Sequence, residues 1–400
     1  MVVQKYGGSS VADLDKIRGV ARRIVRVKEE GYHIVAVVSA MGSSTDNLLS
    51  QAYQVSPAPP KRELDMLLSV GERISASLLT MALHELGHEA ISFTGSQCGI
   101  ITSDNHANAR IIDVRPVRIL DELARDKIVI VAGFQGMSYK REVTTLGRGG
   151  SDTTAIALAA ALGATWCEIC SDVDGVYTAD PRLVPEAEKI ESLSYDEMEE
   201  MGEAGAKVLN PDAIEFARRM GLKVMLTSTF KEGGGTVLLA RDKAASGVAV
   251  KAVATRRKIY LVELSDIDPK ETNEAVALFD ELKAPVESLA LRVGERATAR
   301  IRLAPERVPD WALLERRIGE VFGESARIDA TEGSASLIGP GLGDEVAYLR
   351  QAEQTLRRQG VAFHEIELSR NRLTFFMSAE QVDSATTALH AAFFGRPPSA

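Results

Sequence analysis

The chain has 400 residues, of which 45% are apolar and 26% are charged, and its net charge at pH 7 is −9. This composition is typical of a globular protein with large buried cores, and it excludes disordered, collagen-like and fibrous classes. The acidic balance argues against broad binding to nucleic acid or anionic membranes, because both require a basic face. Any phosphate group must therefore bind at a local site.

The length exceeds one ordinary domain core and predicts two or three domains. The sequence has three cysteines, too few for a disulfide framework, which indicates a reducing compartment. The first residues show no basic segment leading into a long apolar one, and no apolar run reaches ~18 residues. We therefore expect a cytoplasmic protein.

Residues 1–240 alternate short β-branched segments with longer helical patterns. This alternation predicts an α/β domain, an αβα sandwich in which helices cover both faces of a mostly parallel sheet. Ligands of such sheets bind at the carboxyl ends of the strands. The predicted strands are Val2–Tyr6, His33–Ser39, Ala90–Phe93, Ile128–Phe134, Trp166–Cys170 and Lys223–Leu226. The predicted helices are Val11–Glu30, Lys61–Leu86, Asp113–Arg125, Asp152–Leu162, Ser194–Gly202 and Pro211–Met220.

Polar and small residues interrupt the apolar periodicity at Lys231–Gly235 and Arg241–Gly247, so we place the end of the first domain at residue 245. Beyond it, the order strand, helix, strand, strand, helix occurs twice, which predicts two small α+β modules, residues 246–330 and 331–400. The first module has predicted elements at Lys258–Leu264, Lys270–Leu282, Pro285–Val293, Arg296–Leu303 and Asp310–Phe322. The second has predicted elements at Ala335–Ile338, Glu345–Gln359, Phe363–Leu368, Arg372–Met377 and Ala379–Phe393.

Two segments that match metal-site patterns are interpreted as structural. His84-Glu85-Leu86-Gly87-His88 matches a zinc-protease pattern, which needs both imidazoles on one face of a continuing helix. We expect Gly87 to end that helix in the left-handed conformation. Cys167 and Cys170 lie three apart in a predicted strand, point to opposite faces and cannot grip one metal ion. We therefore expect no resident metal.

A glycine-rich turn, Lys5-Tyr6-Gly7-Gly8-Ser9-Ser10, lies between the first predicted strand and the first long helix. Its two glycines let backbone N–H groups approach an anion, the following helix adds a positive dipole, and Lys5 supplies a full charge. This combination suits a triphosphate. The turn matches neither the P-loop nor the dinucleotide fingerprint, and taken alone an ordinary strand-to-helix turn explains it equally well.

Two further loops lie at predicted strand ends. In Thr144–Asp152, Arg148 is a planar donor fork among glycines, which suits a substrate carboxylate. Asp152 has a second interpretation, as the N-cap of the next helix. The loop Ser171–Arg182 offers carboxylates, a tyrosine and an arginine for nucleotide contacts. Each loop is a weak signal alone, but together at the ends of parallel strands they form one candidate site.

Together these segments resemble the aspartokinase family, the ATP-dependent aspartate kinases among the amino-acid kinases. The resemblance covers the first domain almost throughout, and the repeated modules resemble the paired ACT modules of the same family, with a poorer match. The segments that carry it are Lys5–Ser10, Val38–Gly42, Ser69–Arg73, Phe93–Gln97, Thr144–Thr154, Ser171–Arg182 and Ala206–Leu209. The resemblance implies ATP with Mg²⁺, transfer of the γ-phosphoryl to the β-carboxylate of L-aspartate, and a homodimer formed through the ACT-like modules. It also implies the first step of lysine, threonine and methionine biosynthesis.

The resemblance implies roles for individual residues as well. Lys5 and Lys207 bracket the phosphates, and Asp152 organises the lysines. Arg148 pairs with the α-carboxylate of aspartate, and Glu72 meets its ammonium. Ser39, Thr45, Gly149 and Ser151 are the other implied substrate contacts. The implied nucleotide contacts are Gly7, Gly8, Ser9, Ser171, Asp172, Tyr177, Asp180 and Arg182. Mg²⁺ would be held largely by phosphates and water.

Two alternatives stay open. The same fold could phosphorylate glutamate or an N-blocked amino acid, but an acetylated nitrogen would leave Glu72 without a partner. A catalytically dead amino-acid sensor is the other alternative, and it would have no reason to keep the phosphate-binding lysines and the arginine clamp together. Arg141 and Asn210–Asp212 depart from the family pattern, and we interpret them as tuning of ATP affinity and selectivity.

The tail departs from its family where effectors bind. Family ACT modules usually carry a proline-glycine turn, whereas here Pro269 is followed by Lys270 and the turn Gly339–Asp344 is shortened. In a later strand, an effector ammonium would meet Arg370 and Arg372 instead of a carboxylate. We therefore expect that the tail is kept for dimerisation and that millimolar lysine or threonine inhibits weakly or not at all.

Overall fold

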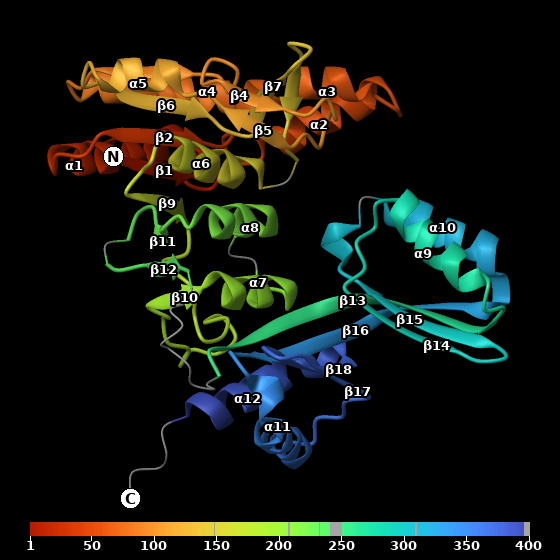
Figure 1. The fold of residues 1–400 in the computed structure, drawn as a ribbon. Coiled ribbons are helices and arrows are strands. Elements are labelled where there is room, and N and C mark those ends of the chain that lie inside the picture. The colour runs from red at the N-terminus through yellow and green to blue at the C-terminus, as the bar shows by residue number, and fades with distance from the viewer. Residues whose placement is uncertain (148, 207–208, 232, 241–249, 309, 396–400) are drawn as a thin grey trace, which may run out of the picture. The chain divides into compact units, whose positions relative to one another are not determined.

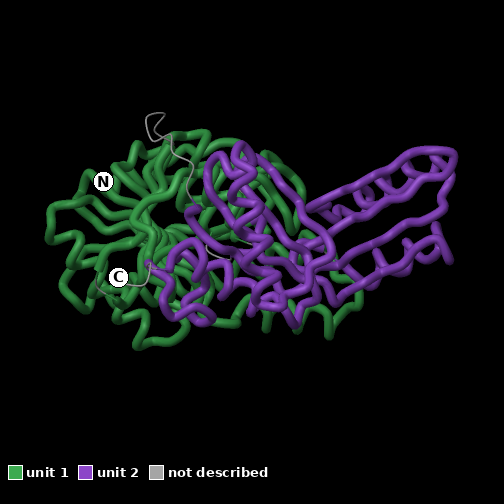
Figure 2. The backbone as a smooth tube through the Cα atoms, turned by 90° about the horizontal axis from the view of Figure 1, so that it is seen from below, with its two compact units in different colours: residues 1–176, 189–202, 207–245 green, residues 177–188, 203–206, 246–400 purple. Residues whose placement is uncertain are grey.

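The computed structural model describes the whole chain except residues 148, 207–208, 232, 241–249, 309 and 396–400 (Figure 1). Its described residues fall into two compact units, which Figure 2 colours separately. Unit 1 comprises residues 1–176, 189–202 and 207–245, and unit 2 comprises residues 177–188, 203–206 and 246–400. Both units are therefore discontinuous along the chain, and the predicted limits at residues 245 and 330 stay predictions.

Unit 1 is built on an eight-stranded sheet of order β10-β12-β11-β9-β1-β2-β6-β3. The six strands from β11 to β3 run parallel, whereas β12 is antiparallel to β11. This confirms the predicted parallel α/β domain and all six of its predicted strands. The strand bounds are β1 Val2–Tyr6, β2 Ile34–Val38, β3 Ala90–Phe93, β6 Ile128–Ala132, β9 Trp166–Ser171, β10 Ser192–Ser194, β11 Val224–Ser228 and β12 Thr236–Leu239.

Helices cover both faces of this sheet, which is why β2 is buried along its whole length. Ile34, Ala36 and Val38 belong to a core shared with α1 and α4, and the alternate residues Val35 and Val37 face α6. The α1 helix begins after Asp13, whose carboxylate accepts a hydrogen bond from the Lys16 N–H. The helix bounds are α1 Leu14–Glu29, α2 Ser44–Val55, α3 Lys61–Leu68, α4 Val70–Glu85, α5 Val117–Leu123, α6 Gly150–Ala161, α7 Tyr195–Glu203 and α8 Pro211–Met220.

Two predicted helices were wrong in part. The expected helix over Asp113–Arg125 begins only at Val117, because Pro116 disfavours helical geometry in the residue before it. Asp113 lies instead in strand β5 (Ile111–Val114). The expected helix over Lys61–Leu86 is two helices, α3 and α4, that meet at Ser69. The α2 helix was not predicted, because it buries no residue and its apolar pattern is weak.

The stretch Lys61–Glu85 is long and apolar enough to cross a membrane by length and composition alone. Within unit 1, however, 44% of its most apolar window is buried, with Leu79 and Leu83 fully enclosed in the core. A core helix of a globular protein has the same features.

A second sheet of unit 1, of order β5-β4-β7-β8, was not predicted. Its strands are too short for a clear alternation of apolar and polar residues to show in the sequence. It follows the candidate loop Phe93–Gln97 and ends where the glycine loop Thr144–Asp152 begins. Its bounds are β4 Ile100–Thr102, β5 Ile111–Val114, β7 Gln135–Ser138 and β8 Val143–Thr145.

Unit 2 contains one six-stranded antiparallel sheet of order β14-β15-β13-β16-β18-β17. Helices α9 and α10 enclose one core with it, and α11 and α12 enclose a second. This confirms the two βαββα modules. The bounds are β13 Ala252–Ile267, β14 Ser288–Val293, β15 Ala297–Leu303, β16 Ala326–Ile338, β17 Glu365–Leu368 and β18 Arg372–Ser378, with α9 Glu271–Glu281, α10 Trp311–Phe322, α11 Val346–Arg358 and α12 Val382–Phe394.

The strands β13 and β16 are longer than predicted and pass through both modules (Figure 1). Val253 near the start of β13 belongs to the core of the second module, whereas Val262 near its end belongs to the core of the first. Register shifts between Arg256 and Leu261 lie between these two parts. The two modules therefore share one continuous sheet.

Candidate functional site

The glycine turn after β1 packs against the loop that follows β2. Gly8 needs to be a glycine, since a Cβ there would lie 3.0 Å from the Ala40 carbonyl oxygen and 3.3 Å from that of Gly42. The Gly42 N–H donates to the Gly8 carbonyl at 3.1 Å, and the Ser39 N–H donates to the carbonyl of Tyr6 at 3.0 Å. The carboxyl ends of β1 and β2 therefore bring the predicted residues Gly7, Gly8 and Ser39 together, as expected for neighbouring parallel strands.

Lys5 and Asp152 form an ion pair beside this turn. Lys5 Nζ lies 2.6 Å from Asp152 Oδ1, with side chains that are only 12% and 13% exposed. A Cβ on Gly7 would lie 3.4 Å from Lys5 Nζ, so the ammonium lies directly against the glycine turn. The predicted catalytic lysine and aspartate thus meet next to the expected phosphate-binding backbone.

Asp152 is not the N-cap of α6, contrary to the second interpretation of the sequence. The N-cap is Gly149, which takes the left-handed conformation with φ of 71°. Asp152 lies inside the first helical turn, where its charge is favourable to the helix dipole and its side chain can reach Lys5. A Cβ on Gly149 would collide with the Asn210 side chain at 2.4 Å, so close packing also requires glycine there.

Glu72 is buried in the first turn of α4 with only 3% of its surface exposed. Its Oε1 accepts a hydrogen bond from the Ala40 N–H at 3.1 Å. Within the described part of the chain, its Oε2 is buried without any hydrogen-bond partner. Burial raises the pKa of this carboxyl to about 7. The geometry leaves one carboxylate oxygen available for a cationic donor beside the loop that contacts Gly8.

Two other predicted substrate contacts, Ser151 and Thr45, lie in unit 1. Ser151 is buried in α6, and its Oγ would lie 2.9 Å from a Cβ on Gly133, the residue after β6. Thr45 is half-buried near the start of α2. Arg148 and Lys207 lie outside the described residues, so their predicted roles stay predictions.

The predicted nucleotide loop is divided between the two units. Ser171 ends β9, and its Oγ makes a local turn with the backbone of Val173. Asp172 is exposed. Tyr177, Asp180 and Arg182 belong to unit 2, where the Arg182 side chain hydrogen-bonds to Asp180 at 2.7 and 3.0 Å. The assignment of these residues to nucleotide binding stays a prediction.

The sequence did not point to Asp65, which accepts a hydrogen bond from Thr145 at the start of the glycine loop Thr144–Asp152. Asp65 is fully buried in α3 and accepts hydrogen bonds from Thr145 Oγ1 at 2.5 Å and from the Ala107 N–H at 3.0 Å. His106 Nδ1 lies 2.6 Å from its other oxygen. An aspartate among the apolar residues Leu64 and Leu68 was the available signal, because a charge on a buried helix face needs dedicated partners.

A second buried network lies under the strand ends. The Glu168 carboxylate accepts hydrogen bonds from Gln4 Nε2 at 2.7 Å and from Thr227 Oγ1 at 2.9 Å, and it pairs with Arg23. Ser10 Oγ lies 2.6 Å from Thr229 Oγ1. These contacts tie the turn after β1 to the end of β11.

The predicted end of the helix at Gly87 is confirmed. Helix α4 ends at Glu85 and Gly87 has φ of 83°, so His84 and His88 do not share a helix. Cys167 and Cys170 are free and buried in β9. In the part of the chain that the structure describes, no three histidine, cysteine, aspartate or glutamate side chains are grouped to hold a metal.

Comparison with known proteins identifies the family. A sequence model of the amino acid kinase family matches residues 1–228. The chain is 42% identical to the aspartokinase of Mycolicibacterium smegmatis and 42% identical to that of Corynebacterium glutamicum, in both cases over 98% of this chain and 96% of the relative. It belongs to the aspartokinase family. It is therefore an enzyme of the phosphotransferase class, and the resemblance seen in the sequence is confirmed.

Solved aspartokinases share the fold along the whole chain. Escherichia coli aspartokinase III in complex with aspartate and ADP superposes with a TM-score of 0.81 at 24% identity, covering 98% of this chain and 100% of that one. The same protein in complex with lysine and aspartate gives a TM-score of 0.78, covering 98% and 99%. At this identity the likeness concerns the fold: an amino-acid-kinase α/β domain with small α+β modules. The aspartokinase family thus accounts for both units.

Proposed function

We propose that the protein transfers the γ-phosphoryl group of MgATP to the β-carboxylate of L-aspartate, forming an acyl phosphate and ADP. The observation that carries the proposal is the buried Oε2 of Glu72, which has no hydrogen-bond partner among the described residues and lies beside the loop that contacts Gly8. Burying a carboxylate oxygen without a hydrogen-bond donor costs free energy. The ammonium of a free amino acid would supply that donor. The aspartokinase relatives support aspartate as that amino acid.

The proposed reaction needs charge stabilisation rather than a general base. The acceptor carboxylate has a pKa of ~3.9 and is ionised at neutral pH. The obstacle is repulsion between this carboxylate and the triphosphate. Lys5 and the backbone N–H groups of the glycine turn would offset the charge on the transferred phosphoryl, and Asp152 keeps Lys5 in position.

The remaining roles in the proposal follow the family resemblance. Lys207 supplies a second cation to the phosphates, and Arg148 clamps the α-carboxylate of aspartate through its planar fork. Ser39, Thr45, Gly149 and Ser151 complete the aspartate site. Gly7, Gly8, Ser9, Ser171, Asp172, Tyr177, Asp180 and Arg182 complete the nucleotide site.

Mg²⁺ would arrive with the nucleotide. The described residues offer no cluster of three metal ligands, which fits an ion that keeps several waters and binds mainly to phosphates. It would supply neutralisation of the phosphate charge.

An acyl-phosphate trapping assay tests the proposal. Purified protein is incubated with MgATP and L-aspartate, L-glutamate or N-acetyl-L-aspartate, with hydroxylamine present to convert the product to a hydroxamate. We expect ADP and hydroxamate in equal amounts with L-aspartate and little with the other two acids. A preference for N-acetyl-L-aspartate would contradict the role of Glu72, and ADP release without hydroxamate would contradict carboxylate transfer.

We also propose a cytoplasmic location and a place at the first step of aspartate-derived amino-acid biosynthesis. Full-length similarity to aspartokinases supports the pathway. Free, buried cysteines without disulfides support a reducing compartment.

Weak feedback inhibition is part of the proposal. The turn at residues 266–271 satisfies its own polar groups: Glu271 Oε2 accepts from the Asp268 N–H at 2.7 Å, and Asp268 Oδ1 accepts from the Lys270 N–H at 2.8 Å. Asp266 Oδ1 accepts a hydrogen bond from Arg296 Nε at 2.7 Å. An effector at this turn would have to displace these bonds. Rate measurements with millimolar L-lysine or L-threonine should show little loss, and strong saturable inhibition by either would overturn this part.

Dimerisation through the ACT-like modules is supported by the edge strand β14. Leu289, Leu291 and Val293 alternate along it and are 47%, 42% and 62% exposed. Leu289 pairs with the core residue Ile301, so these side chains lie on the face that the helices cover elsewhere. A second copy that extends this sheet would bury them and pair the open edge.

A further inference from the structure

The segment that follows strand β11 is held in place by one side chain of helix α1. Arg23 Nη1 donates a hydrogen bond to the carbonyl of Ser228 at 2.7 Å and another to the carbonyl of Thr229 at 3.2 Å. Ser228 is the last residue of β11, so both carbonyls lie at the carboxyl end of the parallel strands, where ligands of such sheets bind. Arg23 therefore fixes backbone beside the candidate site, although it is none of the residues predicted to contact substrate or nucleotide.

A largely buried carboxylate fixes the other half of the Arg23 guanidinium. Glu168 in β9 pairs with Arg23 Nη2 at 2.5 Å, and the two side chains are 11% and 21% exposed. Gln4 and Thr227 donate hydrogen bonds to the same carboxylate. Because a guanidinium is a rigid planar fork, fixing Nη2 also fixes the direction of Nη1 toward the two carbonyls. One arginine thus links α1, β9 and the end of β11.

Helix α1 contacts the same segment a second time, one helical turn before Arg23. A Cβ on Gly19 would lie 3.0 Å from Cε1 of the Phe230 ring, which is tighter than an ordinary van der Waals contact. Gly19 and Arg23 are four residues apart and therefore lie on the same face of α1. The segment 228–230 thus packs on this face of the helix through both its backbone and the Phe230 ring.

Thr229 connects this segment to two loops that are predicted to bind the nucleotide. Its Oγ1 lies 2.6 Å from Ser10 Oγ, in the glycine turn that begins at Lys5. Its N–H donates a hydrogen bond to the carbonyl of Ser171, at the end of β9, at 2.8 Å. Thr229 and Ser10 are only 4% and 1% exposed, so the packing around them leaves little room for adjustment. A shift of Thr229 would therefore move both loops.

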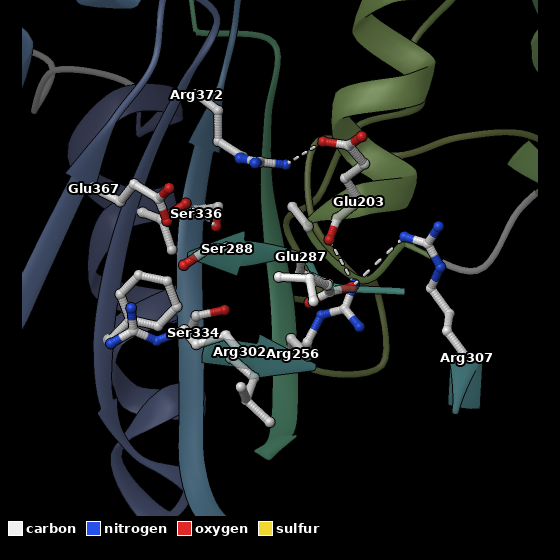
Figure 3. Close-up of a pocket in the computed structure, with 15 residues that line it drawn as sticks. Glu203, Arg256, Glu287, Ser288, Arg302, Arg307, Ser334, Ser336, Glu367 and Arg372 are labelled. Atoms are coloured by element: carbon white, nitrogen blue, oxygen red, sulfur yellow. Dashed lines mark hydrogen bonds and ion pairs between the residues drawn. The ribbon is translucent and has the colours of Figure 1, made fainter. Parts of the chain in front are cut away.

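Unit 2 contains a similar arrangement of an arginine, a carboxylate and a backbone carbonyl. Arg256 donates a hydrogen bond to the carbonyl of Glu203 and pairs with Glu287 at 3.1 Å (Figure 3). Glu203 is the last residue of α7, just as Ser228 is the last residue of β11. In both places, an arginine that a carboxylate orients binds the carbonyl at the end of an element and fixes the chain that follows.

We propose that Arg23 is a positioning residue for nucleotide binding, because through Thr229 it fixes the glycine turn relative to the end of β9. This inference rests on the proposed function. The donors of a binding site must be held within about 0.5 Å of their productive positions. Without Arg23, the Ser228 and Thr229 carbonyls lose a charged donor, and the contact between Thr229 and Ser10 is no longer enforced.

The effect should be confined to the nucleotide. Glu72, the proposed partner of the aspartate ammonium, accepts a hydrogen bond from the Ala40 N–H in the loop after β2. In the sheet, β2 and β9 lie on opposite sides of β1, so Arg23 supports the half of the site that is away from Glu72. Loss of Arg23 should therefore raise the KM for MgATP and leave the KM for L-aspartate nearly unchanged.

The alternative is that the ion pair between Arg23 and Glu168 contributes to folding stability alone. Removing one partner of a buried pair leaves an uncompensated charge, whereas replacing both partners together is often neutral. Arg23→Met should therefore lower the unfolding temperature, and the double variant Arg23→Met/Glu168→Gln should recover much of that loss. The double variant does not restore a donor to the Ser228 and Thr229 carbonyls. Stability and nucleotide binding should thus separate in this protein.

Binding of MgADP to the full-length protein, measured by isothermal titration calorimetry, tests the proposal without turnover. We expect the Kd for MgADP to rise about tenfold in Arg23→Met and to stay about tenfold higher in the double variant. Arg23→Lys should bind only slightly better than Arg23→Met, because an ammonium cannot reproduce the fork. Arg22→Met, on the exposed side of α1, is the matched control and should bind as the wild type does. Wild-type affinity in the double variant, or an equal loss in Arg22→Met, would overturn the proposal.

The acyl-phosphate trapping assay measures the two KM values separately. In Arg23→Met we expect the KM for MgATP to rise about tenfold, with little change in the KM for L-aspartate. Thr229→Val removes the hydroxyl that contacts Ser10 and should give a smaller rise of the same kind, so the test stays decisive if the Arg23 variants are unstable. Thr80→Val is its control, since the Thr80 hydroxyl bonds to Ala76 in its own helix. Equal rises in both KM values would contradict the positioning role.

The outcomes also separate this inference from the proposed function. A wild-type protein that binds no MgADP and forms no hydroxamate would overturn both. A wild type that binds MgADP and forms hydroxamate, together with Arg23→Met and Thr229→Val proteins that bind MgADP equally well, would overturn the role of Arg23 alone.

Discussion

Lys5 Nζ lies 2.6 Å from Asp152 Oδ1, so the ammonium and the carboxylate form a close and largely buried ion pair. Strand β1 carries the lysine and the first turn of α6 carries the aspartate. The ion pair orients the ammonium, and the N–H groups that do not face Asp152 can donate to another acceptor. A phosphoryl oxygen above Gly7 would be such an acceptor.

Lys5→Ala and Asp152→Ala should each lower kcat by about 100- to 1,000-fold, because the lysine stabilises charge that develops on the transferred group. The trapping assay measures the rate, and circular dichroism checks that each variant is folded. Lys140→Ala is the matched control, since Lys140 pairs with Asp104 on the surface. Wild-type turnover by folded Lys5→Ala protein would remove Lys5 from the catalytic residues.

Glu72 should make the stability of the substrate-free protein depend on pH. Its folded pKa of about 7 lies above the ordinary value of 4.5, so the folded state binds more protons than the unfolded state between these values. Stability should therefore fall as pH rises from 4.5 to 7, by up to about 3 kcal/mol from this group. Glu72→Gln should remove this fall and be the more stable protein above pH 7. Urea unfolding at a series of pH values measures the free energy of unfolding of both proteins. Glu85→Gln, on the exposed end of α4, is the control.

The same substitution should impair the use of aspartate. Glu72→Gln replaces a carboxylate by a neutral amide, so kcat/KM for L-aspartate should fall at least about tenfold. In the wild type, kcat/KM should rise with pH as Glu72 ionises near pH 7. A variant with higher stability and unchanged kcat/KM would show that Glu72 faces no ammonium.

Asp65→Asn should loosen the glycine loop that carries Arg148. In the wild type, the Asp65 carboxylate accepts hydrogen bonds from Thr145 and Ala107 and contacts His106. An asparagine amide has a weaker acceptor on one side and a donor on the other. The substitution should therefore lower the free energy of unfolding by about 1–3 kcal/mol. The KM for L-aspartate should rise more than the KM for MgATP. Kinetics with each substrate varied in turn measure the two effects, and Glu63→Gln on the exposed side of α3 is the control. Equal changes in both KM values would indicate a general loss of structure.

Gly8→Ala should raise the KM for MgATP several-fold, because the added methyl group meets two backbone carbonyls that cannot move independently. Gly202→Ala is the control in the same unit, since none of the residues that the structure describes comes within 4 Å of a Cβ there. Unchanged nucleotide kinetics in folded Gly8→Ala protein would show that the turn does not contact ATP.

Leu291→Lys should convert the proposed dimer into a monomer, because it places a charge in the apolar row on the edge of β14. Val276→Lys on the exposed side of α9 should leave the dimer intact. Light scattering at micromolar concentration measures both. A wild-type monomer, or a dimer that persists in Leu291→Lys, would contradict the proposed interface.

The sequence alone determined the main elements, because their signals are local. The six parallel strands are short apolar segments that need burial on both faces, and the helices between them follow a 3.6-residue period. The two βαββα modules were predicted from a repeated order of elements in the sequence. The glycine turn after Val2–Tyr6 was predicted as one part of the candidate site. Gly87 ended its helix as expected because a glycine accepts positive φ without steric cost.

Only the tertiary structure decided which distant side chains meet. The burial of Glu72 beside Ala40, the contact between Lys5 and Asp152, and the three bonds of Asp65 all depend on how separate elements pack, which a local pattern does not encode. The joining of both modules into one sheet by β13 and β16 was hidden for the same reason.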